Sequence, residues 1–228
     1  CRLSFVLIAQ KVHRMFHTML LEVVLMEHTA NHILLRGSLS GLPQFSHENH
    51  GQRFFRFFLE VPRLSGTVDI LPVIAEETLL NSFDLSAGEM LTITGQIRSC
   101  NQRSEGRRRL LIFVFARSIL CEDGEPLNEV ILEGPLCREP TFRRTPLGRE
   151  ICDVMLAVPR AFRRADYLPC ILWGRTAQQV SQCHTSDRLL ICGRLQSRVY
   201  TKITEDGSEE RTAYEISALT AELPEITV

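Results

Sequence analysis

The feature of this sequence that most constrains its fold is an internal repeat. Residues 31–74 align with residues 128–171 at a fixed offset of 97, and 15 of these 44 positions are identical without a gap. One residue later in register, LTITGQIRS from Leu91 aligns with LLICGRLQS from Leu189. Because chance does not hold such a register, the chain contains two copies of one domain of about 95 residues.

The repeat divides the chain into segments with predictable boundaries. The expected segments are an N-terminal extension (1–27), a divergent first domain (28–120), the acidic linker CEDGEPL (121–127), a second domain (128–221) and a short tail (222–228). The extension has too few uninterrupted apolar residues to span a bilayer. Two alternatives stay open for it: an amphipathic helix, or sequence upstream of a native start at Met26.

Each copy has the pattern of an all-β domain. In the second copy, alternating apolar residues and turn signals predict five strands and one helix. The strands are expected at 128–134, 149–160, 166–174, 188–201 and 211–223, with the helix at 175–183. Five strands with a helix between the third and fourth match a small Greek-key barrel of the OB type, which presents one face for oligonucleotides. We therefore predict two tandem OB-fold barrels, each with one short helix.

The charge of the second copy is uneven, although the whole chain has a formal net charge of only -1. Residues 128–202 carry 12 Arg or Lys against 7 Asp or Glu, whereas residues 203–228 carry Arg211 against 7 acids. The body of the second domain is therefore basic and its end is acidic.

The eight cysteines indicate neither a metal site nor a disulfide framework. They contain no CxxC pair, which structural zinc sites usually need, so we expect no metal. Cys170 and Cys192 lie in apolar strand-like runs and are interpreted as reduced core residues. We interpret Cys183 and His184 as an exposed loop pair, not as a nucleophile with its base. This pattern favours a reducing, cytoplasmic setting.

Catalytic signatures are absent from the sequence. It contains no phosphate-binding loop, no metal-ligand set and no matched acid–base pair. We therefore expect a protein that is not an enzyme and that uses no cofactor.

Three segments of the second copy carry a family pattern. They are NEVILEGPLCREPTFRRTPLGREICDVMLAV from Asn128, LPCILWGRTAQQV from Leu168 and DRLLICGRLQSRVYT from Asp187. In order and spacing this copy resembles the bacterial single-stranded DNA-binding proteins. The first copy resembles that family only through the second. The resemblance implies a tandem-OB member over about residues 28–221, which protects single-stranded DNA in replication, recombination or repair.

The resemblance also implies the binding residues. A lone tryptophan in a strand is ordinarily core, but four family positions for base stacking are all aromatic here: Phe162, Tyr167, Trp173 and Tyr200. On an extended strand Tyr167 and Trp173 share one face about 20 Å apart, which suits several stacked nucleotides. The basic residues expected to contact phosphates are Arg143, Arg144, Arg149, Arg160, Arg163, Arg164, Arg175, Arg194, Arg198 and Lys202. Arg144 stands where the family more often has an aromatic residue.

The first copy departs from this pattern. Opposite the four aromatic residues it has Ser65, Ile70, Glu76 and the stretch Asn101–Gln102. Its own aromatic residues gather in FFRFFLE (54–60), whose alternation predicts burial on both strand faces, and Phe45 and Phe142 are interpreted as equivalent core residues. We expect the first domain to be mainly structural or oligomerising. The arginines of its hairpin, Arg103 and Arg107–Arg109, are expected at most to guide a DNA backbone.

Partners follow from the resemblance. Family members commonly gather four OB domains, so a two-domain chain would form a homodimer. The family's acidic, aromatic-ended C-terminal tip is missing from this sequence, which leaves recruitment of replication or repair proteins in doubt. The resemblance implies a nucleoid-associated protein of the cytoplasm that binds no membrane. The alternative is an OB-fold protein-interaction module of the primosomal, replication-restart type with weak DNA binding.

Overall fold

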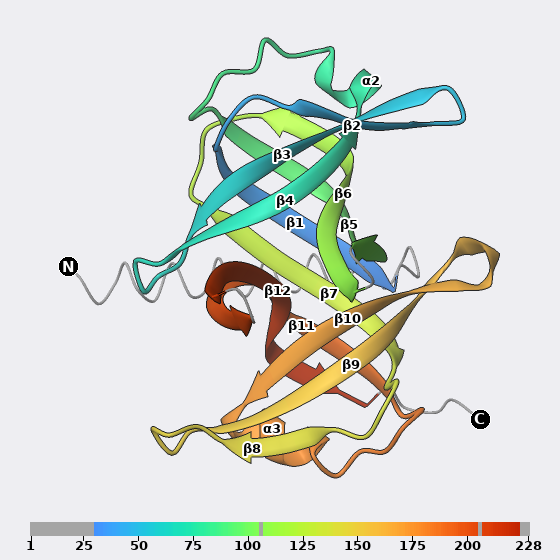
Figure 1. Cartoon of the computed structure of the whole chain (residues 1–228), viewed down its shortest axis with the longest axis vertical. Helices are drawn as coiled ribbons and strands as arrows, with labels where there is room; N and C mark the ends of the chain where they lie inside the picture. The colour runs from blue at the N-terminus through green and yellow to red at the C-terminus, as the bar shows by residue number, and fades with distance from the viewer. Residues whose placement is uncertain (1–29, 105–106, 205–206, 224–228) are drawn as a thin grey trace. The chain divides into compact units, whose positions relative to one another are not determined.

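The computed structural model describes residues 30–104, 107–204 and 207–223, and those from Asn31 onward form one compact unit. Figure 1 shows that the strands of each repeat curl into a barrel of their own. The predicted extension (1–27) and most of the predicted tail (222–228) lie outside the described residues.

The first repeat is built from six strands and a single-turn helix. Its elements are β1 (Asn31–Leu39), β2 (Gln44–Asn49), β3 (Gln52–Pro62), β4 (Val68–Glu76), α2 (Glu77–Leu80), β5 (Met90–Ser104) and β6 (Arg107–Cys121). The second repeat has the same order of strands and α-helix, with one added 3-10 turn. They are β7 (Leu127–Pro135), β8 (Thr141–Arg144), β9 (Glu150–Arg160), the 3-10 turn η1 (Ala161–Arg163), β10 (Arg164–Trp173), α3 (Gly174–Val180), β11 (Arg188–Thr204) and β12 (Gly207–Glu222).

Each repeat closes into a five-stranded barrel. In the second repeat β11 pairs antiparallel with both β7 and β12, and β10 pairs antiparallel with β9. A parallel contact at Cys170↔Ile216 and a bridge at Leu136↔Leu156 complete the ring. The first repeat closes in the same way, with β4 parallel to β6 and β1 paired to β3. The predicted tandem OB fold is confirmed. The short edge strands β2 and β8 were not predicted.

The two repeats share an internal clamp made by an asparagine side chain. Asn31 donates from Nδ2 to the carbonyl of Ile97 at 2.7 Å and accepts the Ile97 N–H at 2.8 Å. Asn128 makes the same two bonds to Leu195, at 2.7 and 2.9 Å. Identical contacts at equivalent positions show that the duplication extends to individual hydrogen bonds.

A glycine in the first strand of each barrel allows a close backbone contact, between β1 and β3 in the first repeat and between β7 and β9 in the second. A Cβ atom on Gly37 would lie 2.6 Å from the carbonyl oxygen of Glu60, and one on Gly134 would lie 2.6 Å from that of Ala157. No side chain fits at such a distance, so both positions need glycine. The repeat keeps a glycine here because barrel closure brings two backbones together.

The barrels are joined edge to edge through their first strands. β1 pairs with β5 on one side and antiparallel with β7 on the other, so all twelve strands belong to one continuous sheet. The register pairs Asn31 with Leu132 and Leu35 with Asn128, and Ile33 faces its own equivalent, Val130. This register is that of a two-fold symmetric strand pair, although both strands come from one chain.

Two predictions about burial are wrong. Phe45 and Phe142 are exposed, because they lie on the edge strands β2 and β8, whose residues are all exposed. Cys183 is buried instead of exposed, because the turn after α3, held by a bond from its N–H to the Val180 carbonyl at 3.0 Å, directs its thiol inward.

The expectation that Phe54–Phe58 is buried on both faces is also wrong in part. Phe54 and Phe57 are buried, but Phe55 and Phe58 are only half-buried. The outer side of Phe55 is contacted by the exposed Phe45 ring and by the Arg53 guanidinium. The outer face of this strand is therefore partly solvated.

Replacing the clamp asparagines tests the shared core. We expect Asn31→Ala to lower the free energy of unfolding by about 2–4 kcal/mol, because it leaves a buried N–H and a buried carbonyl unpaired. Asn128→Ala should cost about 1–2 kcal/mol, because the half-buried Asn128 site admits water. Urea unfolding of both variants measures the difference. Equal losses would contradict this account.

Candidate nucleic-acid interface

Strand β10 separates core residues from outward aromatic rings. Leu168, Cys170 and Leu172 are buried, whereas Tyr167 is 48% exposed and Trp173 is 39% exposed. The indole Nε1–H of Trp173 donates to Ser217 Oγ at 3.3 Å, which orients the ring while one side stays open. This strand therefore presents two aromatic surfaces at opposite ends of one face.

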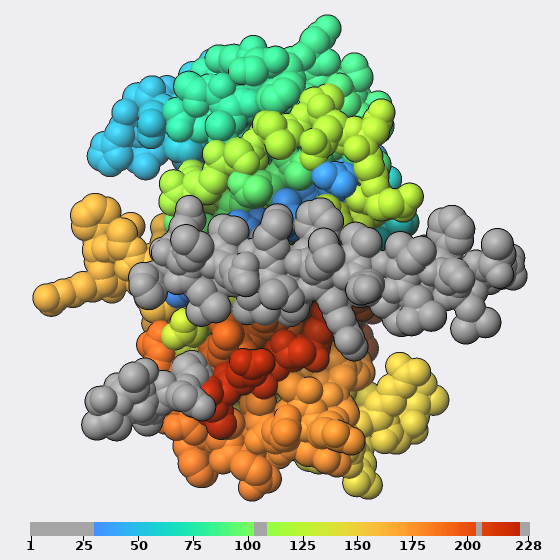
Figure 2. All heavy atoms as spheres, turned by 180° about the vertical axis from the view of Figure 1, so that it is seen from behind, coloured from blue at the N-terminus to red at the C-terminus, as the bar shows by residue number. Residues whose placement is uncertain are grey.

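The most exposed ring, Phe162, lies in the turn between β9 and β10 and is 93% exposed. Phe162 and Arg163 have φ angles of 59° and 55°, in the left-handed region that side chains other than glycine rarely adopt. This segment, amber in Figure 2, projects from the surface of the second repeat. Strain of this kind gathers at binding sites, and here it directs a ring into solvent.

Tyr200 supplies the fourth aromatic surface, on the long hairpin of β11 and β12. It is 37% exposed, and the Arg198 guanidinium carbon lies 5.6 Å from its ring centroid. Arg198 is also 3.9 Å from Glu215, a long ion pair. The Tyr200 ring therefore has a guanidinium cation close to its face.

Several predicted phosphate contacts are already paired with carboxylates. Arg143 donates from Nε to Asp153 at 2.6 Å, which raises the pKa of that guanidinium, and Arg144 donates to Glu150 at 2.8 Å. Both pairs lie on the exposed β8–β9 ribbon. They would bind a phosphate only by sharing their charge with these acids.

Other predicted contacts are more open. Arg149, Arg163, Arg164 and Arg175 are exposed, and no ion pair between described residues engages them. Lys202 is half-buried near the end of β11. These side chains can turn toward a phosphate without breaking an existing pair.

Arg194 is placed differently from the rest. Its Nε is buried without a hydrogen-bond partner. The residue lines a cavity of about 330 Å³ together with Arg63, Asp69 and the linker residues Glu125 and Pro126. The Arg194 side chain therefore lines this cavity and does not lie with the exposed arginines that were predicted to contact phosphates.

The cysteines add no chemistry to this surface. Burial raises the pKa of Cys152 to about 11 and also raises the pKa of Cys170, so both thiols are protonated at neutral pH. In the part of the chain that the structure describes, no group of His, Cys, Asp or Glu side chains could hold a metal ion. None of the described helices is long and apolar enough to cross a membrane.

The equivalent face of the first repeat lacks aromatic rings. Ser65 and Gln102 are exposed, Ile70 is exposed and Glu76 is half-buried. The cross-strand pairs differ as well: Trp173 pairs with Ile151 in the second repeat, whereas Glu76 pairs with Phe54, a buried ring, in the first.

The first repeat also carries an exposed aromatic–arginine cluster that the sequence pattern did not predict. Phe45 and Phe55 meet edge to face at 6.0 Å, and the Arg53 guanidinium lies 5.4 Å from both rings. The signal was the Pro-x-Phe sequence shared by both repeats, but only the structure shows that these phenylalanines lie on edge strands.

Comparison with known proteins agrees with this architecture. The model of the "Single-strand binding protein family" matches residues 127–224, which is the second repeat. Single-stranded DNA-binding protein B of Bacillus subtilis is 36% identical over 80 residues, covering 32% of this chain and 71% of the relative. The chain belongs to the single-strand binding protein family.

Other relatives in the single-strand binding protein family are longer. The single-stranded DNA-binding protein of Halalkalibacterium halodurans is 35% identical over 95 residues, covering 39% of this chain and 54% of the relative. Single-stranded DNA-binding protein 1 of Staphylococcus aureus is 38% identical over 81 residues, covering 32% and 48%. The chain thus spans about half the length of these two relatives.

The likeness in structure extends over both repeats. A deletion variant of the single-stranded DNA-binding protein from Thermus aquaticus superposes with a TM-score of 0.69 at 25% identity, covering 85% of this chain and 94% of that one. The wild-type protein gives a TM-score of 0.70 at 24% identity over 85% and 92%. The first repeat therefore shares the family fold although its sequence has diverged.

A pair of glycine substitutions tests the strained turn. Arg163→Gly should raise the free energy of unfolding by about 1 kcal/mol, because glycine adopts a positive φ without strain. Arg164→Gly should lower it by about 0.5–1 kcal/mol, since Arg164 has a φ of -96° and gains only backbone entropy when unfolded. Thermal melting of both variants checks the opposite signs. If both substitutions stabilised the protein, or neither did, the backbone at Arg163 would not be strained.

Proposed function

We propose that this protein binds single-stranded DNA without strong sequence preference, through base stacking on the second repeat and phosphate contacts from its arginines. The observation that carries the proposal is the exposure of all four aromatic residues at family stacking positions: Phe162, Tyr167, Trp173 and Tyr200. Every nucleobase has a π face, so stacking recognises a single strand whatever its sequence. Protection of single strands in replication, recombination or repair is the role that fits this binding.

The alternative function, a protein-interaction module with weak DNA binding, has less support. Such a module has no need to keep a ring at each of the four positions. We also propose no enzymatic activity and no cofactor, which is supported by the family to which the chain belongs. We keep the cytoplasmic, nucleoid-associated setting as part of this proposal.

The proposal includes a division between the two domains and a homodimer. We place the first domain at 28–120 and the DNA-binding domain at 128–221, with 121–127 as the linker. The first domain lacks aromatic residues at the stacking positions, which supports a mainly structural role. Two chains of two barrels would supply four OB domains.

Trp173 provides a direct test of DNA binding because it is the only tryptophan. Titration with oligo-dT at low salt should quench its fluorescence, and Trp173→Ala should weaken binding by about 5- to 150-fold, since each stack contributes about 1–3 kcal/mol. Phe45→Ala, which removes an exposed ring of the first repeat, is the matched control and should change affinity less than twofold. Unchanged emission together with normal binding by Trp173→Ala would exclude stacking at this position.

Assembly is tested by light scattering after gel filtration. We expect a mass twice that of the 26.0 kDa chain at micromolar concentration. A chain that elutes and scatters as a strict monomer under these conditions would rule out the homodimer while leaving the DNA-binding proposal intact.

A further inference from the structure

Two equivalent aspartates, Asp69 and Asp166, are completely buried where the repeats meet. Asp69 lies near the start of β4 and Asp166 near the start of β10, the equivalent strands of the two repeats. Each aspartate accepts a hydrogen bond from a backbone N–H of the other repeat. Ser197 N donates to Asp69 at 2.7 Å, and Ser99 N donates to Asp166 at 2.7 Å. A buried carboxylate also needs a cation nearby, and the two sites obtain it differently.

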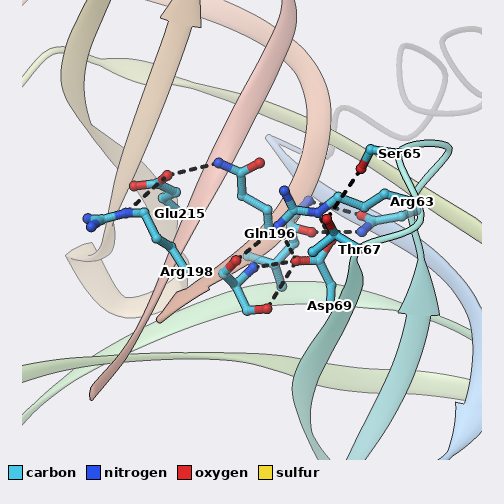
Figure 3. Close-up of polar contacts among 10 residues, drawn as sticks. Arg63, Ser65, Thr67, Asp69, Gln196, Arg198 and Glu215 are labelled. Atoms are coloured by element: carbon cyan, nitrogen blue, oxygen red, sulfur yellow. Dashed lines mark hydrogen bonds and ion pairs between the residues drawn. The ribbon is translucent and has the colours of Figure 1, made fainter. Parts of the chain in front are cut away.

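At Asp69 the cation comes from the same repeat. Arg63 donates from Nε to one carboxylate oxygen at 2.7 Å and from Nη2 to the other at 2.5 Å, a bidentate pair. Its Nη2 also donates to the carbonyl of Ser197 at 2.9 Å. Figure 3 shows this cluster, with the carboxylate of Asp69 enclosed between Arg63 and the strand that carries Gln196. Arg63 therefore bonds both to Asp69 of its own repeat and to the backbone of the other repeat.

At Asp166 the closer of two cations comes from the first repeat. Arg98 donates from Nη1 to Oδ2 at 3.0 Å. Arg160, the equivalent of Arg63, reaches Oδ1 only through Nη1 at 3.3 Å. Its side chain is 31% exposed, against 18% for that of Arg63. The position equivalent to Arg98 in the second repeat is Gln196, which carries no charge, so only Asp166 receives a second arginine.

The residue after Asp166 is the stacking residue Tyr167, and the first repeat holds its backbone too. The Tyr167 N–H donates to Ser99 Oγ at 2.7 Å. On the opposite side the equivalent hydroxyl, that of Ser197, donates to the Asp69 carboxylate at 3.0 Å. Ser99 thus bonds both to Asp166 and to the backbone of an outward-facing ring.

We propose that Arg98 and Ser99 of the first repeat are positioning residues for single-stranded DNA bound to the second repeat. Arg98 is the closer cation of Asp166, so Arg160, which is held by a single longer contact, can turn to a DNA phosphate, and Ser99 fixes the backbone of Tyr167. The inference rests on the proposed DNA-binding function. It gives the first repeat a role in the binding site although its own stacking residues are gone.

The charges of the cluster explain why Arg98 matters. Desolvation lowers the pKa of the Arg98 guanidinium, and the hydrogen bond to Asp166 opposes that shift. Without Arg98, the buried Asp166 carboxylate has Arg160 as its remaining cation and should draw it into a bidentate pair like that of Arg63. Arg160 would then be lost to DNA.

The salt dependence of oligo-dT binding measures this loss. For single strands, each phosphate contact contributes about 0.7 to the slope of log K against log salt. Arg98→Gln and Arg160→Gln should each reduce the slope by about 0.7, and the double variant should reduce it no further. Arg117→Gln is the matched control: it removes a neighbouring charge that contacts Gln96 at 3.3 Å but not Asp166, and should keep the wild-type slope.

A rescue variant separates positioning from direct contact and avoids an unpaired buried charge. In Asp166→Asn with Arg98→Gln, the neutral side chain no longer attracts Arg160, so the wild-type slope should return. A slope that stays low, or additive losses in the Arg98→Gln and Arg160→Gln double variant, would mean that Arg98 contacts DNA itself and would overturn the proposal. Arg98→Lys keeps the cation and should behave as wild type.

Ser99 is tested by a separate pair of variants. Ser99→Ala should weaken oligo-dT binding about fivefold, as expected for one lost hydrogen bond. Ser118→Ala removes a bond within the first repeat, the 2.6 Å contact with Thr94, and should lose similar thermal stability with less than a twofold change in affinity. Equal affinity of the two variants for oligo-dT would show that Ser99 is not a positioning residue for DNA. Failure of the wild-type chain to bind oligo-dT would instead reject the proposed function.

Discussion

The pairing of β1 with β7 is the constraint on which the rest of the structure depends. Each barrel contributes its first strand, and the antiparallel register between them is symmetric about Ile33 and Val130. This register brings the third strand of each barrel against the fourth strand of the other, where Asp69 meets Ser197 and Asp166 meets Ser99. Because both joints form within one chain, the symmetry need not be kept in sequence.

The freedom to diverge explains the asymmetry between the repeats. A symmetric dimer of identical chains would place the same side chain at both joints, but a duplicated chain can place Arg98 at one and Gln196 at the other. The first repeat kept the residues that close its barrel, such as Asn31 and Gly37, and lost the rings of the stacking face. Its residues Arg98 and Ser99 contact the second repeat, which has the exposed aromatic rings.

Much of the fold and of the candidate site could be predicted from the sequence, and the wrong predictions have physical causes. The strand pattern correctly placed Cys170 in the core and Tyr167 and Trp173 together on an outer face. Phe45 and Phe142 were misplaced because an aromatic residue after a proline has the same pattern on an edge strand as in a core. Cys183 was misplaced because the turn after a short helix, and not periodicity, sets its direction.

The sequence by itself determined the duplication, the barrel class and the aromatic residues of the second repeat, because these depend on short-range periodicity and on positions preserved in register. Only the tertiary structure decided which arginines are paired, which are open, and that Arg98 reaches Asp166 across 68 positions. Such contacts join residues from different repeats, and each partner's local pattern is that of an ordinary surface strand. Side chains far apart in the chain acquire a shared role only when the sheet brings them within hydrogen-bond distance.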